Sequence, residues 1–127
     1  KPARITTMAT LTGAIMIALG HTATGVFTNT PYAAEQLKQE GYLHGDCFWP
    51  MPIYQTNYDD LKEIEADFNN ITKNRLMGSS VAAAFIDLFV NPGIEFVHLD
   101  IAGSSTDAKG IPTGASIPTL QAFIEQL

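Results

Sequence analysis

The sequence predicts an α/β domain with a mixed, largely parallel sheet flanked by helices. Three observations support this prediction. Residues 5–11 and 94–101 are short, apolar and rich in β-branched side chains, which is typical of buried strands. Each segment is followed by a turn that contains glycine. Between them, residues 31–41 carry apolar side chains on one helical face, as in a helix that covers a sheet.

Composition limits the partners and the compartment. The 127 residues, of which 46% are hydrophobic, suffice for a single domain over residues 1–127 with its own core. The net charge is −6 and the seven basic residues are scattered, so we expect neither nucleic acid nor a membrane surface as a partner. The only cysteine, Cys47, excludes an internal disulfide and fits a reducing compartment such as the cytoplasm. Because Lys1 precedes a predicted strand by a few residues, we expect the chain to be part of a longer protein.

The first strand leads into a candidate ligand-contacting loop, residues 10–13. We expect residues 5–11 to be buried on both faces and residues 14–19 to be helical, which places Thr12 and Gly13 at the junction. In open α/β sheets, the carboxyl end of a strand and the first amides of the next helix face the same crevice. Alternatively, the threonines only satisfy local backbone groups and Gly13 only permits a tight bend.

The remaining predicted elements are a strand over 26–28, a helix over 30–41, extended segments over 48–53 and 66–71, a helix over 79–90 and a helix over 117–127. Thr30 is the expected N-cap of the first of these helices, with Pro31 at its first position. Ser79 or Ser80 is the expected N-cap of the second. The last helix should turn an apolar face inward, made by Leu120, Phe123, Ile124 and Leu127.

Acidic residues gather in the middle of the chain, at Asp59, Asp60, Glu63, Glu65 and Asp67. A cluster of carboxylates can bind a hard cation, but the glycine-directed loop geometry of such sites is absent. We therefore interpret this run as a solvated helical face.

Histidine and cysteine side chains give three candidate sites for metal binding or nucleophilic catalysis. His21 lies in a turn with no second ligand at strand or helix spacing. His44 and Cys47 could form a thiol–imidazole pair, but no third group orients them. His98 and Asp100 share one strand face and could touch one ion. Hydrogen bonding to loops at the strand end is the favoured role, because two ligands leave most of a coordination sphere empty.

Residues 102–105 follow the second buried strand just as Thr12 and Gly13 follow the first. We therefore expect both loops to lie along one crevice and to form a pocket. Residues 106–114 contain glycine and proline and are expected to form a surface loop.

Six blocks of sequence resemble, in order and spacing, the leucyl aminopeptidase (cytosol aminopeptidase) family of metal-dependent exopeptidases. They are ATLTGA at 9–14, TGVFTN at 24–29, FWPMP at 48–52, ADFNNI at 66–71, AAAF at 82–85 and HLDIAG at 98–103. The resemblance covers nearly all of the chain. It implies that the fold is a fragment of the family's catalytic domain, from its later, C-terminal part.

The resemblance implies an enzyme that releases N-terminal amino acids such as leucine from peptides. Two divalent metal ions, manganese or zinc, would activate a water molecule in such an enzyme. In the family, the metal-ligating carboxylates, a ligating lysine and a catalytic arginine precede the ATLTGA block, and those motifs are absent from this chain. We therefore expect the chain to supply substrate-pocket loops but no metal ligand and no catalytic residue, and to be inactive when isolated. The resemblance further implies a cytoplasmic homo-hexamer.

The family's substrate-binding roles can be carried over to five positions. By resemblance, Leu11 would offer its carbonyl and Gly13 its amide to the substrate backbone. Thr10, Gly13, Ala102 and Ser105 would line the pocket for the departing N-terminal side chain. Ser105 stands where the family often has an apolar residue, so a strict preference for leucine is in doubt.

The chain departs from the family pattern in three other places. Thr7 stands where an acidic residue is expected, Val81 replaces a threonine, and the loop over 109–114 is altered. None of these changes removes a residue with a catalytic role. Two other functions remain open at this point: a non-catalytic structural or interaction subunit of the same fold, and an unrelated α/β domain that binds a small ligand.

Overall fold

The computed structural model describes residues 1–63, 65–72 and 74–125. Its sheet contains the strands β1 (Arg4–Ala9), β2 (Thr24–Thr28), β3 (Phe48–Pro50) and β4 (Glu95–Asp100), in the order β1-β4-β2-β3. β1 runs parallel to β4 and β2 runs parallel to β3, whereas β2 and β4 are antiparallel. This confirms the predicted mixed, largely parallel sheet.

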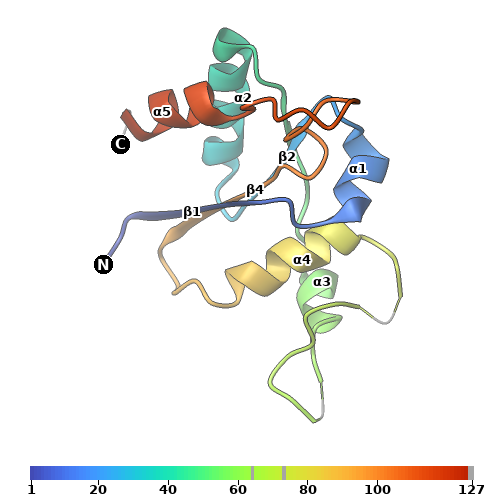
Figure 1. The fold of residues 1–127 in the computed structure, drawn as a ribbon. Helices are drawn as coiled ribbons and strands as arrows, with labels where there is room; N and C mark the ends of the chain where they lie inside the picture. Colours follow the sequence, from blue (N-terminus) through green and yellow to red (C-terminus); the bar gives the residue numbers. More distant parts are fainter. Residues whose placement is uncertain (64, 73, 126–127) are drawn as a thin grey trace.

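Helices cover both faces of the sheet (Figure 1). The helices are α1 (Gly13–Leu19), α2 (Pro31–His44), α3 (Gln55–Asp59), α4 (Gly78–Asp87) and α5 (Ile117–Glu125). α2 and α5 pack on one face, while α1 and α4 pack on the other and α3 lies against α4. None of the described helices is long and apolar enough to cross a membrane.

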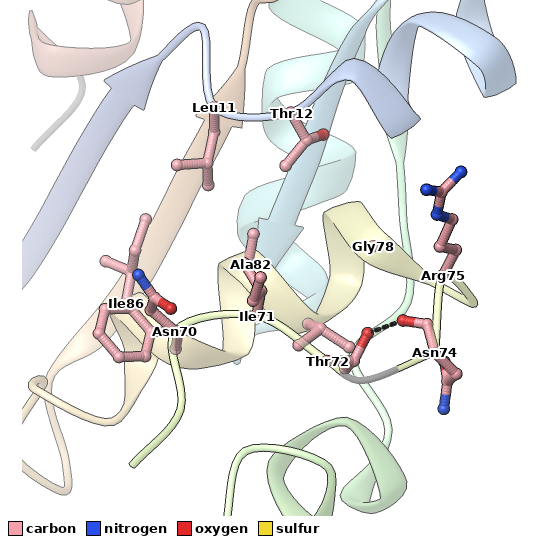
Figure 2. Close-up of a pocket in the computed structure, with 12 residues that line it drawn as sticks. Leu11, Thr12, Asn70, Ile71, Thr72, Asn74, Arg75, Gly78, Ala82 and Ile86 are labelled. Atoms are coloured by element: carbon pink, nitrogen blue, oxygen red, sulfur yellow. Dashed lines mark hydrogen bonds between the residues drawn. The ribbon is translucent and has the colours of Figure 1, made fainter. Parts of the chain in front are cut away.

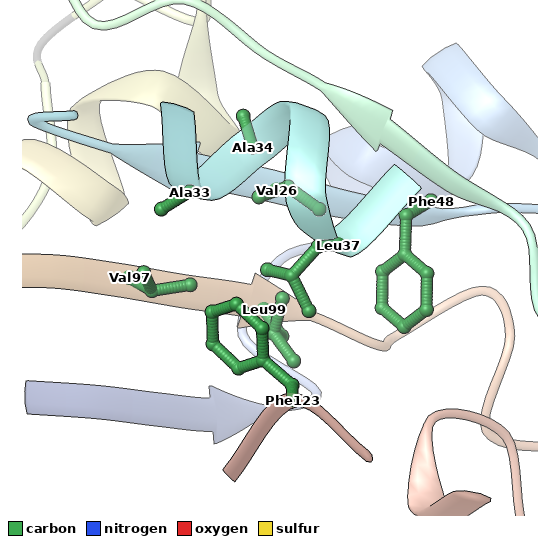
Figure 3. Packing of buried hydrophobic residues seen from close by; sticks show 8 residues of the cluster. All are labelled: Val26, Ala33, Ala34, Leu37, Phe48, Val97, Leu99 and Phe123. Carbon is green, nitrogen blue, oxygen red and sulfur yellow. The ribbon is translucent and has the colours of Figure 1, made fainter. Parts of the chain in front are cut away.

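Side chains alternate along the strands and so divide the core into two parts. Val97 and Leu99 of β4 face α2 and α5, where they pack with Leu37 and Phe123 (Figure 3). Phe27 of β2 points to the other face and packs with residues of α1 and α4. The α2 pattern predicted from sequence is confirmed, since its apolar residues Ala33, Ala34 and Leu37 are buried.

The prediction that residues 5–11 are buried on both faces is wrong. β1 pairs with β4 alone in the described sheet and therefore lies at its edge. The ring of Phe123 in α5 covers the first residue, Arg4, with the guanidinium carbon 4.1 Å from the ring centroid. Further along the same face, Met8 is left 45% exposed. How much of β1 is covered by α5 depends on tertiary packing. The apolar composition of the strand does not indicate it.

The N-terminus of α4 differs from the prediction, and the predicted N-cap of α2 lacks its capping hydrogen bond. α4 begins at Gly78, and its N-cap is Met77, a non-glycine residue with φ of 50°. Ser79 and Ser80 lie inside the first turn and are buried. Thr30 does occupy the N-cap of α2, but its side chain makes no capping hydrogen bond; instead its hydroxyl donates to Asn29 Oδ1 at 3.1 Å.

Two glycines explain where α2 runs and where it ends. The helix continues past Gly41, which is buried. A Cβ at this position would lie 2.4 Å from Cδ2 of the Phe48 ring, so the close packing of helix and ring requires glycine. Gly45 ends the helix in the left-handed conformation, with φ of 80°.

Three further predictions need correction. α3 ends at Asp59, so the acidic run is not a helical face: Asp60 is the C-cap, and its later members lie outside any helix. Residues 66–71 form bends and irregular chain instead of the expected extended segment. In α5 Phe123 is buried as predicted, but Ile124 is 62% exposed, and Leu127 lies outside the described residues.

Candidate functional site

Asp100, the last residue of β4, joins the two predicted loops. Its Oδ1 accepts hydrogen bonds from the backbone N–H of Leu11 at 3.1 Å and of Ala102 at 3.2 Å. Its Oδ2 accepts from the hydroxyl of Thr12 at 2.7 Å. Asp100 is fully buried, so these donors replace the water that a carboxylate otherwise requires. The carboxyl ends of β1 and β4 therefore lie side by side, as predicted.

Thr12 also begins the helix that leaves this junction. It has extended backbone angles, and its Oγ1 accepts from the N–H of Ile15 at 3.2 Å, which makes it the N-cap of α1. One hydroxyl thus donates to β4 and caps α1. The local role that we weighed for this threonine is confirmed, and the same bond fixes the backbone that carries Leu11 and Gly13.

The loop after β4 is held against the turn before β2. The ring of His21 donates from Nδ1 to the carbonyl of Gly103 at 2.9 Å. A Cβ on Gly103 would lie 1.9 Å from the carbonyl oxygen of Gly20, so the two backbones meet only because residue 103 is glycine. His21 therefore ties two loops together in this structure.

A cavity of about 710 Å³ opens beside the β1–α1 junction (Figure 2). Leu11 and Thr12 form one wall, and α4 forms another through Gly78, Val81 and Ala82. The remaining wall comes from residues of the loop before α4: Asn70, Ile71, Thr72, Asn74 and Arg75. The volume is in the range of small-molecule sites, and the lining combines apolar surface with amide, hydroxyl and guanidinium groups.

The structure brings only part of the predicted site to this cavity. Leu11 lines it, whereas Thr10, Gly13, Ala102 and Ser105 are not among its lining residues. Ala102 packs instead against the core on the α1 and α4 side of the sheet. Ser105 is half-buried, and both of its backbone polar groups are bonded. Its N–H donates to the Ile101 carbonyl at 2.9 Å, and its carbonyl accepts from the Thr113 N–H at 3.0 Å.

A smaller, polar cavity of about 240 Å³ lies on the other side of the β4 loop, lined by residues that include His21, Thr24, Asp46 and Ser104. Thr24 Oγ1 and Ser104 Oγ are joined by a hydrogen bond of 2.6 Å. Asp46 Oδ1 accepts from the N–H of Ser116 at 3.0 Å, just before α5 begins. These bonds hold the chain on both sides of residues 106–114, which form a surface loop as predicted.

His98 lies beside the first strand in the middle of the sheet. A hydrogen bond of 2.8 Å joins its Nδ1 to Thr7 Oγ1, and its Nε2 is buried with no partner among the described residues. Burial lowers the pKa of His98 below its ordinary value, and the nearby charge of Asp100 offsets part of that shift. The preferred interpretation is confirmed for Asp100, which hydrogen-bonds the loops at the strand end, but not for His98, whose partner Thr7 lies within β1.

The described residues do not fit a metal centre. No group of three or more His, Cys, Asp or Glu side chains among them could hold an ion. Both oxygens of Asp100 are taken by backbone and hydroxyl donors, and His98 Nδ1 is bonded to Thr7. His44 Nε2 lies 3.7 Å from the carboxylate of Glu40, and no hydrogen bond joins His44 to Cys47 in the part of the chain that the structure describes.

Comparison with known proteins decides the family. Residues 1–121 match the family described as "Cytosol aminopeptidase family, catalytic domain". The chain belongs to this family. A probable cytosol aminopeptidase of Bdellovibrio bacteriovorus is 37% identical over 98% of the chain and 26% of its own length. One from Cupriavidus pinatubonensis is 42% identical over 98% of the chain and 24% of its own length.

A solved structure of a mutant tomato leucine aminopeptidase has the same fold. It superposes with a TM-score of 0.92 at 31% identity, over 98% of this chain and 25% of its own length. The chain thus spans about a quarter of the cytosol aminopeptidases that it matches. Because residues 1–121 match the cytosol aminopeptidase family, the hypothesis of an unrelated α/β domain that binds a small ligand is wrong.

Sequence reasoning missed the loop and helix walls of the large cavity. We expected a helix over 79–90 and assigned no ligand-binding role to it or to the loop before it. A signal was present, since Asn70, Asn74 and Arg75 place amide and guanidinium groups directly before an apolar helix. What brings them to Leu11, some sixty positions earlier in the chain, is the packing of α4 against α1.

Proposed function

We propose that this chain is the substrate-pocket part of a metal-dependent aminopeptidase that releases N-terminal amino acids, such as leucine, from peptides. Membership of the cytosol aminopeptidase family supports the reaction class. The observation that carries the proposal for this chain is the position of Leu11, at the wall of a cavity of about 710 Å³ and at the carboxyl end of a strand.

The chain's own residues bind and position substrate in this proposal. The carbonyl of Leu11 and the amide of Gly13 hold the peptide backbone, and the Asp100–Thr12 bond keeps that loop in place. Thr10, Gly13, Ala102 and Ser105, which do not line the large cavity, form a separate pocket for the N-terminal side chain in this proposal. Two divalent ions, manganese or zinc, supply the activated water when bound. Their ligands must come from outside this chain, since its described residues do not fit them.

A hydrolysis assay on the full-length protein tests this function. The protein is supplied with manganese and a leucine-linked chromogenic substrate, and a chelator is then added. Turnover that the chelator abolishes is the expected result. Absence of turnover with several aminoacyl substrates and supplied metal would favour a non-catalytic structural or interaction subunit of the same fold.

The proposal includes assembly into a homo-hexamer and a cytosolic location. The apolar character of α4 supports assembly, since Phe89 just beyond its end remains 68% exposed in this chain and suits burial by a neighbouring subunit. The similarity to proteins named as cytosol aminopeptidases supports the location. Light scattering of the full-length protein tests the assembly: a mass of six subunits is expected, and a monomer would contradict it.

A further inference from the structure

We propose that Arg75 binds the free C-terminal carboxylate of the substrate and thereby makes the enzyme prefer dipeptides. This inference rests on the proposed aminopeptidase function and adds a substrate class to it. It depends on the composition of the large cavity, on the state of the Arg75 side chain and on the length of a dipeptide.

The cavity has one apolar side and one polar side. α4 contributes the apolar side, through Val81, Ala82, Phe85 and Ile86. The loop before α4 contributes four polar residues, Asn70, Thr72, Asn74 and Arg75, together with Ile71. Figure 2 shows Leu11 above the cavity and Arg75 at one end of it. A ligand that fits both sides has a side chain for the first and an anionic or strongly polar end for the second.

The guanidinium of Arg75 is free to bind the anionic end of such a ligand. No hydrogen bond or ion pair engages it among residues 1–63, 65–72 and 74–125, although acidic residues outnumber basic ones by thirteen to seven in the whole sequence. The loop around it is instead closed by its neighbours. Thr72 Oγ1 donates to the Asn74 carbonyl, and Asn74 Oδ1 accepts from the Leu76 N–H at 2.9 Å.

A dipeptide matches this arrangement. By the proposed function, Leu11 holds the backbone near the scissile bond. The residue after that bond then lies in the cavity, with its side chain against α4. In a dipeptide this residue ends in a carboxylate, which a guanidinium can bind through two parallel hydrogen bonds. In a longer peptide an uncharged amide stands at the same place, and that pairing is lost.

The test compares Leu-Ala with its amide, Leu-Ala-NH2, as substrates of the full-length protein. For the wild type, kcat/KM for the free acid should exceed that for the amide by about two- to fivefold, as expected for one ion pair made by an exposed guanidinium. In Arg75→Gln the ratio should fall to about one, through a higher KM for the acid and an unchanged KM for the amide. Arg75→Lys should retain part of the preference for the acid, because lysine keeps the positive charge but cannot form the two parallel hydrogen bonds of a guanidinium.

The matched control is Lys38→Gln, which also removes one positive charge. Lys38 lies on α2, on the opposite face of the sheet, with its Nζ 5.3 Å from the centroid of the Trp49 ring. It should leave the acid-to-amide ratio unchanged. An equal decrease of the acid-to-amide ratio in Arg75→Gln and in Lys38→Gln would contradict specific recognition of the carboxylate. A wild-type ratio of one would contradict it as well.

A binding measurement separates this inference from the proposed function. Leu-Ala with a reduced CH2–NH bond, as the acid and as the amide, is titrated calorimetrically into the metal-free protein. Tighter binding of the acid, lost in Arg75→Gln, supports carboxylate recognition even if no hydrolysis is seen. Equal affinities of acid and amide overturn it even if the protein is an active aminopeptidase. Equal thermal midpoints of wild type and variants show that the fold is intact.

Discussion

Asp100 and Thr12 stand 88 positions apart in the sequence, yet a hydrogen bond of 2.7 Å joins their side chains. Through it, the end of β4 fixes the start of α1, and with it the backbone of Leu11, whose N–H donates to the same carboxylate. The junction between strand and helix is therefore held by a residue from the neighbouring strand. The shape of the candidate substrate loop depends on this contact.

Replacing Thr12 by valine should loosen this junction. Valine keeps the shape but removes the hydroxyl that donates to Asp100 and caps α1, so the free energy of local opening should fall by about 1–2 kcal/mol. Hydrogen–deuterium exchange of residues 11–15 in the full-length protein measures it. Thr12→Ser keeps the hydroxyl and is the control. Equal exchange in the two variants would show that the bond does not hold the loop.

Replacing Gly103 by alanine should separate the β4 loop from the turn before β2. The new Cβ would lie 1.9 Å from the Gly20 carbonyl oxygen, and backbone on both sides must shift. We expect a loss of more than about 2 kcal/mol in unfolding free energy by urea denaturation. Gly13→Ala is the matched control, because nothing lies within 4 Å of its Cβ position, and it should cost less than about 0.5 kcal/mol. A similar cost for both variants would argue against the close approach.

Protonation of His98 should destabilise the protein. Burial lowers its pKa in the folded state, so the unfolded chain binds the proton more readily. The stability that depends on neutral His98 is present above the unfolded pKa of about 6.5 and is lost as the pH falls towards the lower folded value. The difference in unfolding free energy between wild type and His98→Gln, measured from pH 8 to pH 5, should therefore shrink as the pH falls.

Thr7→Asp should oppose this pH effect. The substitution places a carboxylate where Thr7 Oγ1 now lies, 2.8 Å from His98 Nδ1, and restores the acidic residue that the family pattern leads us to expect. An adjacent negative charge favours the imidazolium, so the pKa of His98 should rise and the loss of stability below pH 6.5 should diminish. NMR titration of the His98 ring in both proteins measures the shift. An unchanged pKa would show that the side chains do not interact.

Local sequence features predicted the parts of the structure that depend on near neighbours. Thr12 and Gly13 were placed correctly at a strand-to-helix junction, because a capping hydroxyl and a glycine are local signals. The side-by-side position of the loops that follow β1 and β4 was expected from two similar strand–loop patterns. The family resemblance added the expected roles of Leu11 and Ser105, which composition and spacing do not carry.

The rest depends on contacts between distant segments. Met77 begins α4 from a left-handed conformation, for which a methionine gives no signal. Met8 is 45% exposed, whereas Arg4 on the same face of β1 lies against Phe123 of α5, more than a hundred positions later. Arg75 reaches the candidate site only because α4 packs beside α1. In each case the deciding interaction is tertiary, and a single sequence does not encode it as a local pattern.

The central claim is that these loops bind the free N-terminus of a peptide for metal-dependent hydrolysis. The most direct test incubates the full-length protein and manganese with a leucine-terminated peptide and with the same peptide acetylated at its N-terminus, and follows the products by mass spectrometry. We predict release of free leucine from the first peptide only, abolished by a chelator. Cleavage of both peptides, internal cleavage, or turnover that survives the chelator would contradict the account.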